Sequence, residues 1–189
     1  MRLFFGIPVD DDTRRRAPNV QERLRDIAGK VNWVEPANLH LTLRYIGDVP
    51  DEDVTRVAEA AEGCWREAVP DTVALQGVGV FPNPRQPRVI WVGLSEGGEL
   101  LDRLHEALND RLEAKLHMER ERRKFTPHLT IGRVKTPPTG DGLTRAIKEL
   151  ADVNVGAFLA SSFVLYESTL TRHGPVYSVI RKYAAQDPA

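Results

Sequence analysis

A four-residue pattern, His-Leu-Thr followed by an aliphatic residue, occurs twice in this chain, as His40-Leu41-Thr42-Leu43 and His128-Leu129-Thr130-Ile131. With five His and eleven Thr in 189 residues, chance would place a Thr two positions after a His about 0.3 times. Side chains alternate faces along a β-strand, so each His shares one face with its Thr, and the aliphatic residues occupy the other. The pattern therefore predicts two equivalent strands, each with an apolar face for packing and a polar face for a cleft.

The predicted elements repeat around this pattern. A histidine strand, a helix and two further strands are predicted between 38 and 94, and again between 127 and 183. We expect one bilobal domain over residues 1–189, of the α/β class in its α+β form, with two antiparallel sheets related by a pseudo-twofold axis, outer helices and a central cleft that carries both histidine strands. The elements are strands at 2–9, 31–34, 38–47, 72–81, 88–94, 127–134, 153–170 and 175–183, and helices at 10–30, 50–70, 97–117 and 142–150.

Two imidazoles and two hydroxyls that face one cleft suit substitution at phosphorus. His40 and His128 supply a general base and a general acid, because an ordinary histidine pKa of about 6.5 allows either protonation state near neutral pH. Thr42 and Thr130 can donate hydrogen bonds to the non-bridging phosphate oxygens. The sequence thus predicts a phosphoesterase site with His40 and His128 as catalytic residues.

The other histidines and the cysteine show no ligand spacing. His105 and His117 fall on a leucine-rich helix and His173 in a turn, with no His-x-His or Cys-x-x-Cys pair, so we expect neither a metal site nor a cofactor. Cys64 cannot form an internal disulfide, and we interpret it as a packed apolar residue of a protein in a reducing compartment. No apolar stretch approaches the roughly 20 residues that span a bilayer. We expect a cytoplasmic monomer.

Charge restricts where a polyanion could bind. The net charge is −1, so binding of nucleic acid requires a local basic patch. One basic run, 120–124, directly precedes the second histidine strand and makes Arg122, Arg123 and Lys124 candidates for contacts with RNA. The alternative is a solvated loop.

The residues around the motifs resemble a known family. The segment 125–133, Phe-Thr-Pro-His-Leu-Thr-Ile-Gly-Arg, together with the first motif, resembles the 2H phosphoesterase superfamily, and within it the bacterial RNA 2′,3′-cyclic phosphodiesterases, also called 2′-5′ RNA ligases. The similarity extends to the opening strand 2–7, the approach to the first motif at 33–40 and the closing segments 163–168 and 174–177. One departure is Tyr45, where the family pattern has a bulkier apolar residue or Phe.

The resemblance implies a function and residue roles. Members hydrolyse 2′,3′-cyclic phosphate ends of RNA to 2′-phosphates without a metal and can join RNA ends by a 2′-5′ linkage without a nucleotide triphosphate. His40 matches the proton donor, His128 the proton acceptor, and Thr42 and Thr130 the phosphate-binding threonines. Arg133 is a further phosphate-binding candidate, although strict alternation directs it away from the cleft unless Gly132 bulges the strand.

Two other functions fit the same residues. A phosphodiesterase for small cyclic-phosphate nucleotides, such as ADP-ribose derivatives, would need the same groups at the phosphate and would differ only in the flanking surface. A non-catalytic nucleotide-binding module could keep the cleft, but it would not need all four His and Thr groups. The basic run favours an RNA end as the substrate.

Overall fold

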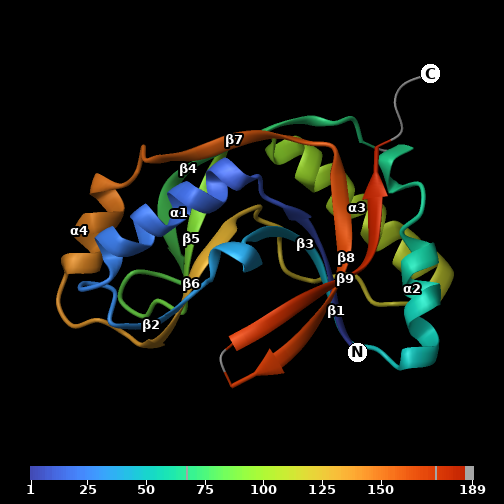
Figure 1. The fold of residues 1–189 in the computed structure, drawn as a ribbon, viewed down its shortest axis with the longest axis horizontal. Helices are drawn as coiled ribbons and strands as arrows, with labels where there is room; N and C mark the ends of the chain where they lie inside the picture. Colours follow the sequence, from blue (N-terminus) through green and yellow to red (C-terminus); the bar gives the residue numbers. More distant parts are fainter. Residues whose placement is uncertain (67, 173, 186–189) are drawn as a thin grey trace.

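The computed structural model describes residues 1–66, 68–172 and 174–185. Its strands form a nine-stranded sheet in the order β7-β4-β5-β6-β3-β1-β8-β9, with β2 paired to β6 (Figure 1). All pairings in this sheet are antiparallel. The strands are β1 (Arg2–Pro8), β2 (Lys30–Trp33), β3 (His40–Asp48), β4 (Asp71–Phe81), β5 (Val89–Glu96), β6 (Leu129–Thr136), β7 (Asn154–Ala160), β8 (Ser162–Thr171) and β9 (Gly174–Ala184), and the helices are α1 (Asp11–Leu24), α2 (Val54–Ala60), α3 (Gly98–Leu116) and α4 (Gly142–Glu149), with short 3₁₀ turns at Pro36–Asn38, Asp51–Asp53 and Cys64–Arg66.

The two histidine strands lie at the centre of the strand order. β3 and β6 are neighbours, each flanked by three more strands, so β1 takes the place of β5, β8 that of β4, and β9 that of β7. Within the described residues, β3 and β6 pair through one residue pair, Leu41 opposite Leu129. The predicted pseudo-twofold arrangement of two antiparallel halves is confirmed, and the halves form one continuous sheet.

The repeated unit begins earlier in the chain than the sequence pattern suggested. The strand order equates β1-α1-β3-α2-β4 with β5-α3-β6-α4-β8. The predicted repeat, which started at each histidine strand, is therefore wrong in its starting point, because the equivalent units begin at β1 and β5. The reason is that the chain changes halves inside each unit, since β4 pairs with the half that contains β6, and β8 with the half that contains β3.

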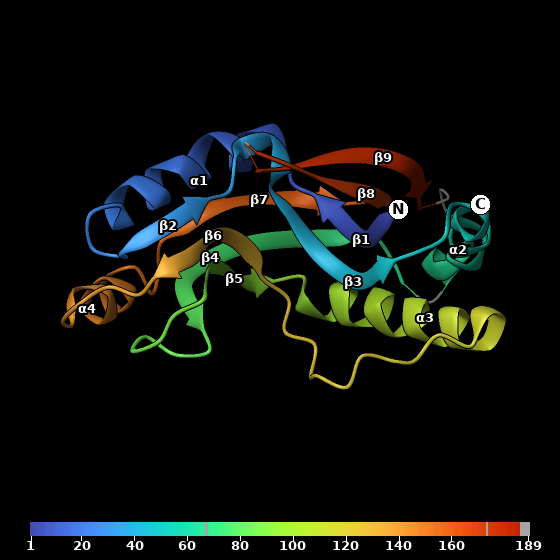
Figure 2. The ribbon, with the colours of Figure 1, turned by 90° about the horizontal axis from the view of Figure 1, so that it is seen from below.

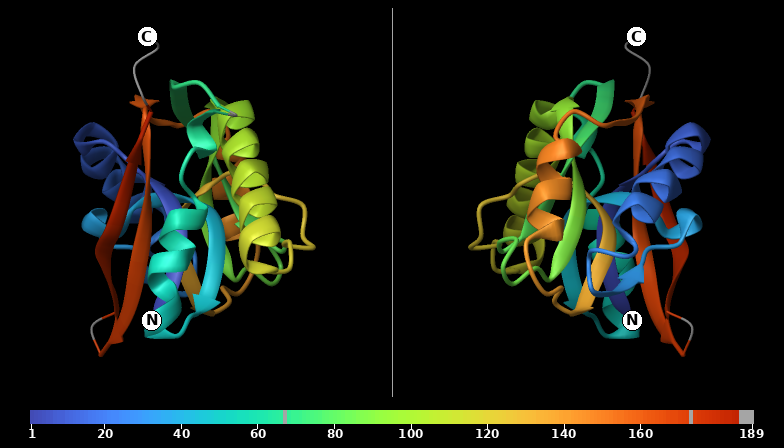
Figure 3. Two further views of the ribbon diagram at one scale, coloured as in Figure 1. Left: turned by 90° about the vertical axis from the view of Figure 1, so that its right-hand side faces the viewer. Right: turned by 90° about the vertical axis from the view of Figure 1, so that its left-hand side faces the viewer.

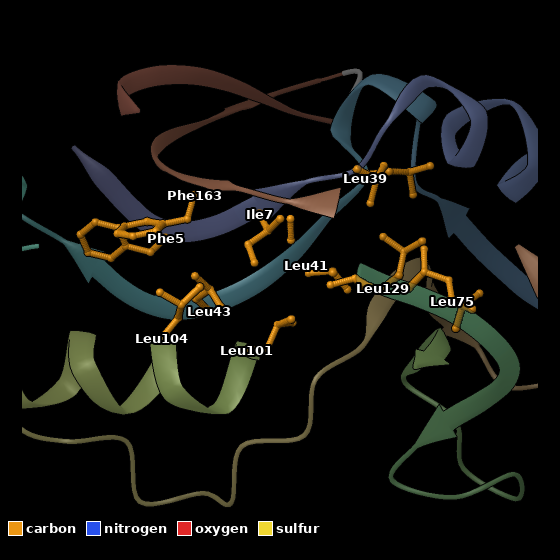
Figure 4. Packing of buried hydrophobic residues seen from close by; sticks show 14 of the residues in the cluster. Phe5, Ile7, Leu39, Leu41, Leu43, Leu75, Leu101, Leu104, Leu129 and Phe163 are labelled. Atoms are coloured by element: carbon orange, nitrogen blue, oxygen red, sulfur yellow. The ribbon is translucent and has the colours of Figure 1, made fainter. Parts of the chain in front are cut away.

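The helices are exchanged between the halves in the same way. α1 follows β1 but packs against β6 and β7, whereas α3 follows β5 but packs against β3. The two helices therefore lie on opposite sides of the strands (Figures 2 and 3). Leu43 on β3 faces Leu101 and Leu104 of α3, and Leu41 meets Leu129 nearby (Figure 4). The aliphatic face of each motif is buried, as predicted, with Leu41 and Leu129 both 0% exposed.

Three predicted boundaries are wrong. The helix expected at 10–30 ends at Leu24, and Gly29, at φ 79°, turns the chain into β2. The helix expected at 50–70 is interrupted at Gly63, where φ is 80°, so Cys64 belongs to a 3₁₀ turn. The strand expected at 153–170 is divided into β7 and β8. Apolar periodicity continues through each of these breaks, which local turns determine.

Of the helices in the described part of the chain, none combines the length and the apolar character needed to cross a bilayer.

Leu41→Ala should destabilise the protein by about 3 kcal/mol, because a fully buried leucine at the junction would leave a cavity. Urea denaturation measures the change in the free energy of unfolding. Leu159→Ala is the matched control, since Leu159 on β7 is 65% exposed, and it should change stability by less than about 0.5 kcal/mol. Equal effects of the two substitutions would show that the central pair is not a packed junction.

Candidate active site

The central pair brings both motifs to one face of the sheet. Since Leu41 lies opposite Leu129 in an antiparallel pair, His40 lies beside Thr130 and Thr42 beside His128. Directly opposed side chains on one face are about 5 Å apart. A cleft of about 420 Å³ opens on this face, and its lining includes His40, Thr42, Thr130 and Arg133.

Both histidine rings are held by the same backbone contact. Nδ1 of His40 lies 2.8 Å from the carbonyl oxygen of Asn38, and Nδ1 of His128 lies 2.7 Å from that of Thr126, in each case two residues upstream. A carbonyl only accepts, so Nδ1 carries the proton in both rings and Nε2 is left for chemistry. Nε2 of neutral His40 accepts from the Thr42 hydroxyl at 3.1 Å.

Aromatic side chains enclose each histidine. Phe4 and Tyr177 lie 4.7 and 5.3 Å from the His40 ring, and Phe81 lies 5.1 Å from the His128 ring. Burial in this apolar surrounding lowers the pKa of His40 to about 4, and the charge of Arg133 and the neighbouring His128 add to the effect, against the bond to Asn38. Burial, aided by the charge of Arg133, also lowers the pKa of His128. Without a ligand, we expect the neutral form of both rings to predominate near pH 7.

Arg133 reaches the cleft because β6 carries a bulge. Ile90 pairs with Gly132 and Trp91 with Thr130, so Ile131 is an extra residue on β6. After this bulge Arg133 returns to the face of Thr130 and lines the cleft. The condition stated from the sequence, a bulge at this point of the strand, is met, with Ile131 and not Gly132 as the extra residue. Gly132 is required beside it, because a Cβ would lie 2.7 Å from Val31 and 2.9 Å from Trp33.

Several residues of the cleft were not identified from the sequence. Asn38 donates to the carbonyl of Pro175 at 2.8 Å and so ties the first motif to the β8–β9 hairpin. The hairpin contributes Tyr177 and Arg172 to the lining, and β2 contributes Trp33. Tyr177 and Arg172 come from a segment distant in sequence from both motifs, and Trp33 is placed by the pairing of β2 with β6. For Trp33 and Tyr177, only their position in the segments that carry the family resemblance, 33–40 and 174–177, could have indicated them.

The basic run lies beside α3, outside the lining of the cleft. Arg120 forms ion pairs with Glu106, Asp110 and Glu113 of that helix. Arg122 lies 3.6 Å from a carboxylate oxygen of Glu119, and Arg123 and Lys124 are exposed. Contact of Arg122, Arg123 and Lys124 with RNA stays a prediction.

The remaining polar candidates occupy structural positions. Cys64 is 1% exposed and His105 3% exposed, both inside the core. His117 ends α3 in a left-handed conformation at φ 54°. His173 lies outside the described residues. Within those residues, no cluster of three or more His, Cys, Asp or Glu side chains is arranged to hold a metal ion.

Comparisons with known proteins find related sequences over nearly the whole chain. The model of the 2′-5′ RNA ligase superfamily matches residues 11–171. An RNA 2′,3′-cyclic phosphodiesterase of Methanothermobacter thermautotrophicus is 36% identical over 178 residues, covering 94% of this chain and 95% of the relative. One of Archaeoglobus fulgidus is also 36% identical, over 97% of this chain and 99% of the relative.

Solved structures share the fold. TT0787 of Thermus thermophilus superposes with a TM-score of 0.81 at 29% identity, over 98% of both chains. LigT of E. coli, complexed with 3′-AMP, superposes with a TM-score of 0.72 at 25% identity, over 97% of both chains.

Arg133→Met should raise the pKa of both His40 and His128, because a positive charge that disfavours the imidazolium is removed. NMR titration of the two rings measures this. Lys135→Met, an exposed change on the same strand, is the control and should leave both pKa values unchanged. Unaltered titration in the Arg133 variant would place its guanidinium away from the histidines.

Proposed function

The chain belongs to the 2′-5′ RNA ligase superfamily, and we propose that it is an RNA 2′,3′-cyclic phosphodiesterase that converts a 2′,3′-cyclic phosphate end into a 2′-phosphate. The observation that carries the proposal is the matched pair of histidines, each fixed through Nδ1 by a carbonyl two residues upstream. This arrangement places two imidazoles on one face, with a guanidinium beside them. Substitution at phosphorus uses one group that accepts a proton, one that donates a proton, and a positive charge near the phosphate oxygens.

In the proposed reaction, a water molecule attacks the phosphorus atom of the cyclic ester. His128 accepts the proton of that water as the new P–O bond forms. The bond from phosphorus to the ribose 3′-oxygen breaks, and His40 gives its proton to that oxygen. The products are a 2′-phosphomonoester and a free 3′-hydroxyl. Arg133, Thr42 and Thr130 bind the non-bridging oxygens, and no step passes through a metal ion.

The substrate itself contributes to the protonation of His40. Because the pKa of His40 is about 4 in the unliganded site, only a small fraction of His40 is protonated at neutral pH. A cyclic phosphodiester carries one negative charge, and an opposite charge nearby favours imidazolium. Binding of the substrate therefore raises the pKa of His40 and prepares the acid.

The same site can carry out ligation. If a 5′-hydroxyl of a second RNA end takes the place of water, its oxygen forms the bond to phosphorus and a 2′-5′ linkage results. The energy comes from opening the cyclic ester, so no nucleotide triphosphate is consumed.

A small cyclic-phosphate nucleotide is a second candidate substrate. The observation that favours it is the position of the basic run, because Arg120 is paired with acids of α3 and the run does not line the described cleft. Recognition of the cyclic phosphate would then depend on Arg133 and Arg172 alone among the arginines of that lining.

We predict that His40→Ala and His128→Ala each lower turnover of an RNA 2′,3′-cyclic phosphate by at least roughly 100-fold, since a positioned acid or base contributes about that much. Initial rates are measured in EDTA, with circular dichroism to confirm folding. His117→Asn is the control, because it replaces a histidine outside the cleft by a residue that tolerates the left-handed conformation. Near-normal rates in both His40→Ala and His128→Ala would show that the repeated His-Leu-Thr motif has a structural role only.

A better leaving group should separate the roles of the two histidines. With a 3′-deoxynucleoside 2′-(4-nitrophenyl phosphate), the departing oxygen needs no proton. The loss caused by His40→Ala should shrink to less than about 10-fold on this substrate, whereas His128→Ala should keep its full loss. The opposite pattern of rescue would exchange the two roles.

Replacing Arg122, Arg123 and Lys124 together by Gln tests the substrate class. If RNA binds along the run, affinity for a cyclic-phosphate oligonucleotide falls and depends less on salt, because fewer counterions are released. Turnover of a cyclic mononucleotide should not change. If neither substrate is affected, the small-nucleotide candidate is favoured; if both are affected equally, the run supports the strand that follows it.

A further inference from the structure

Each catalytic motif is followed by a β-bulge at the same position. On β3, Gly6 pairs with Thr42 and Phe5 with Arg44, so Leu43 is the extra residue. On β6 the extra residue is Ile131, directly after Thr130. A bulge changes the face on which all later residues of the strand lie.

The bulges determine which later side chains of β3 and β6 lie on the same face as the histidines. Beyond the second bulge, Arg133 lines the cleft. Beyond the first, Arg44 is buried, at 6% exposed, and Tyr45 pairs with Phe4, which lies 4.7 Å from His40. Tyr45 thus has, five residues after His40, the same position in its strand that Arg133 has five residues after His128, although Tyr45 does not line the described cleft.

A buried helix side chain binds each bulge. Gln21 of α1 is 5% exposed, and its side-chain amide donates to the carbonyl of Ile131 at 3.0 Å and to that of Val34 at 2.8 Å. His105 of α3 is 3% exposed, and its Nδ1 donates to the carbonyl of Leu43 at 2.7 Å. The two helices are equivalent in the repeat, and each contacts the residue directly after a catalytic threonine.

We propose that Gln21 and His105 are positioning residues for the reaction, which hold the two bulges and thereby fix the groups that each catalytic strand presents to the cleft. The kinetic part of this inference rests on the proposed function. The structural part concerns the register of the strands and can be measured without substrate.

The carbonyl of Ile131 accepts from the backbone N–H of Val34 at 3.0 Å as well as from Gln21, and Gln21 also donates to the carbonyl of Val34. A buried carbonyl that loses a donor is destabilised, so without Gln21 the bulged register loses stability relative to a regular one. In a regular strand Arg133 would move to the face of Leu129 and leave the cleft. Gln21 is not itself among the residues that line the cleft, so any effect on the histidines must pass through the two backbone segments that it binds, at Ile131 of β6 and at Val34.

His105 also contacts the segment before the second motif. The ring of His105 stacks on Phe125 with the centroids 4.1 Å apart, and its Nε2 accepts from the side-chain amide nitrogen of Asn109 at 3.0 Å. Phe125 precedes His128 by three residues. His105 therefore contacts the segment that leads into the second motif as well as the bulge of the first.

The test of Gln21 uses NMR titration of the catalytic rings in the whole protein. Gln21→Met keeps the shape and removes both donors, so Arg133 should withdraw and the pKa of His40 and His128 should rise, as in Arg133→Met. The other charged or titratable groups near these rings, which the variant does not touch, are Glu35, Arg172, Tyr166 and Tyr177. Val20→Ala, a buried change on the same helix, controls for lost stability and should leave both pKa values unchanged. Unchanged titration in folded Gln21→Met would overturn the proposal.

The role of His105 is tested by two variants, one of which keeps a hydrogen-bond donor while the other has none. They test the proposal even if Gln21→Met does not fold. Asn places its amide nitrogen where Nδ1 of His lies, whereas Leu offers no donor. His105→Asn should keep kcat within about 3-fold of the native value, and His105→Leu should lower it by about 10-fold or more, with folding of both verified by thermal denaturation. Equal kcat in the two folded variants would overturn a positioning role for His105.

Failure of the proposed function itself would give a different result. The native protein would then show no turnover, while the pKa shifts expected for Gln21→Met would still be observed by NMR.

Discussion

The pairing of Leu41 with Leu129 is the contact on which the site depends. It is the one residue pair that joins β3 to β6 in the described part of the chain, and it makes the strands of the two halves one continuous sheet. Because the pairing is antiparallel, it sets each histidine beside the threonine of the other motif. α1 packs against β6 and α3 against β3, so each histidine strand is supported by a helix that follows a strand of the other half.

Burial gives the site its electrostatic character. Aromatic side chains around His40 exclude water and hold its pKa near 4, and Arg133 adds a positive charge beside both rings. Such a cleft favours an anion, which compensates the guanidinium and makes imidazolium favourable. In the proposed reaction, the affinity for a phosphodiester and the supply of the catalytic proton therefore have the same physical origin, and the bulges that place Arg133 contribute to both.

The sequence predicted what local geometry determines. Alternation along a strand was enough to place His40 on one face with Thr42, and His128 on one face with Thr130. The doubled pattern was enough to predict two related halves whose histidine strands face one cleft. Arg133 could be predicted only conditionally, because its face depends on the bulge at Ile131. The phase of the repeat and the contributions of Tyr177 and Trp33 could not be derived, since they depend on strands that change halves and on pairings distant in sequence. Gln21 and His105 look like ordinary helix residues until the bulge carbonyls are located.

The most direct test of the proposed mechanism is the fate of oxygen in a single hydrolysis. RNA with a 2′,3′-cyclic phosphate end is incubated with the protein and EDTA in oxygen-18 water, and the product is examined by phosphorus NMR and mass spectrometry. We expect a 2′-phosphomonoester that carries one oxygen-18 atom on phosphorus, at a rate that EDTA does not change. A 3′-phosphate product, or loss of turnover in EDTA that returns with added metal, would contradict this mechanism.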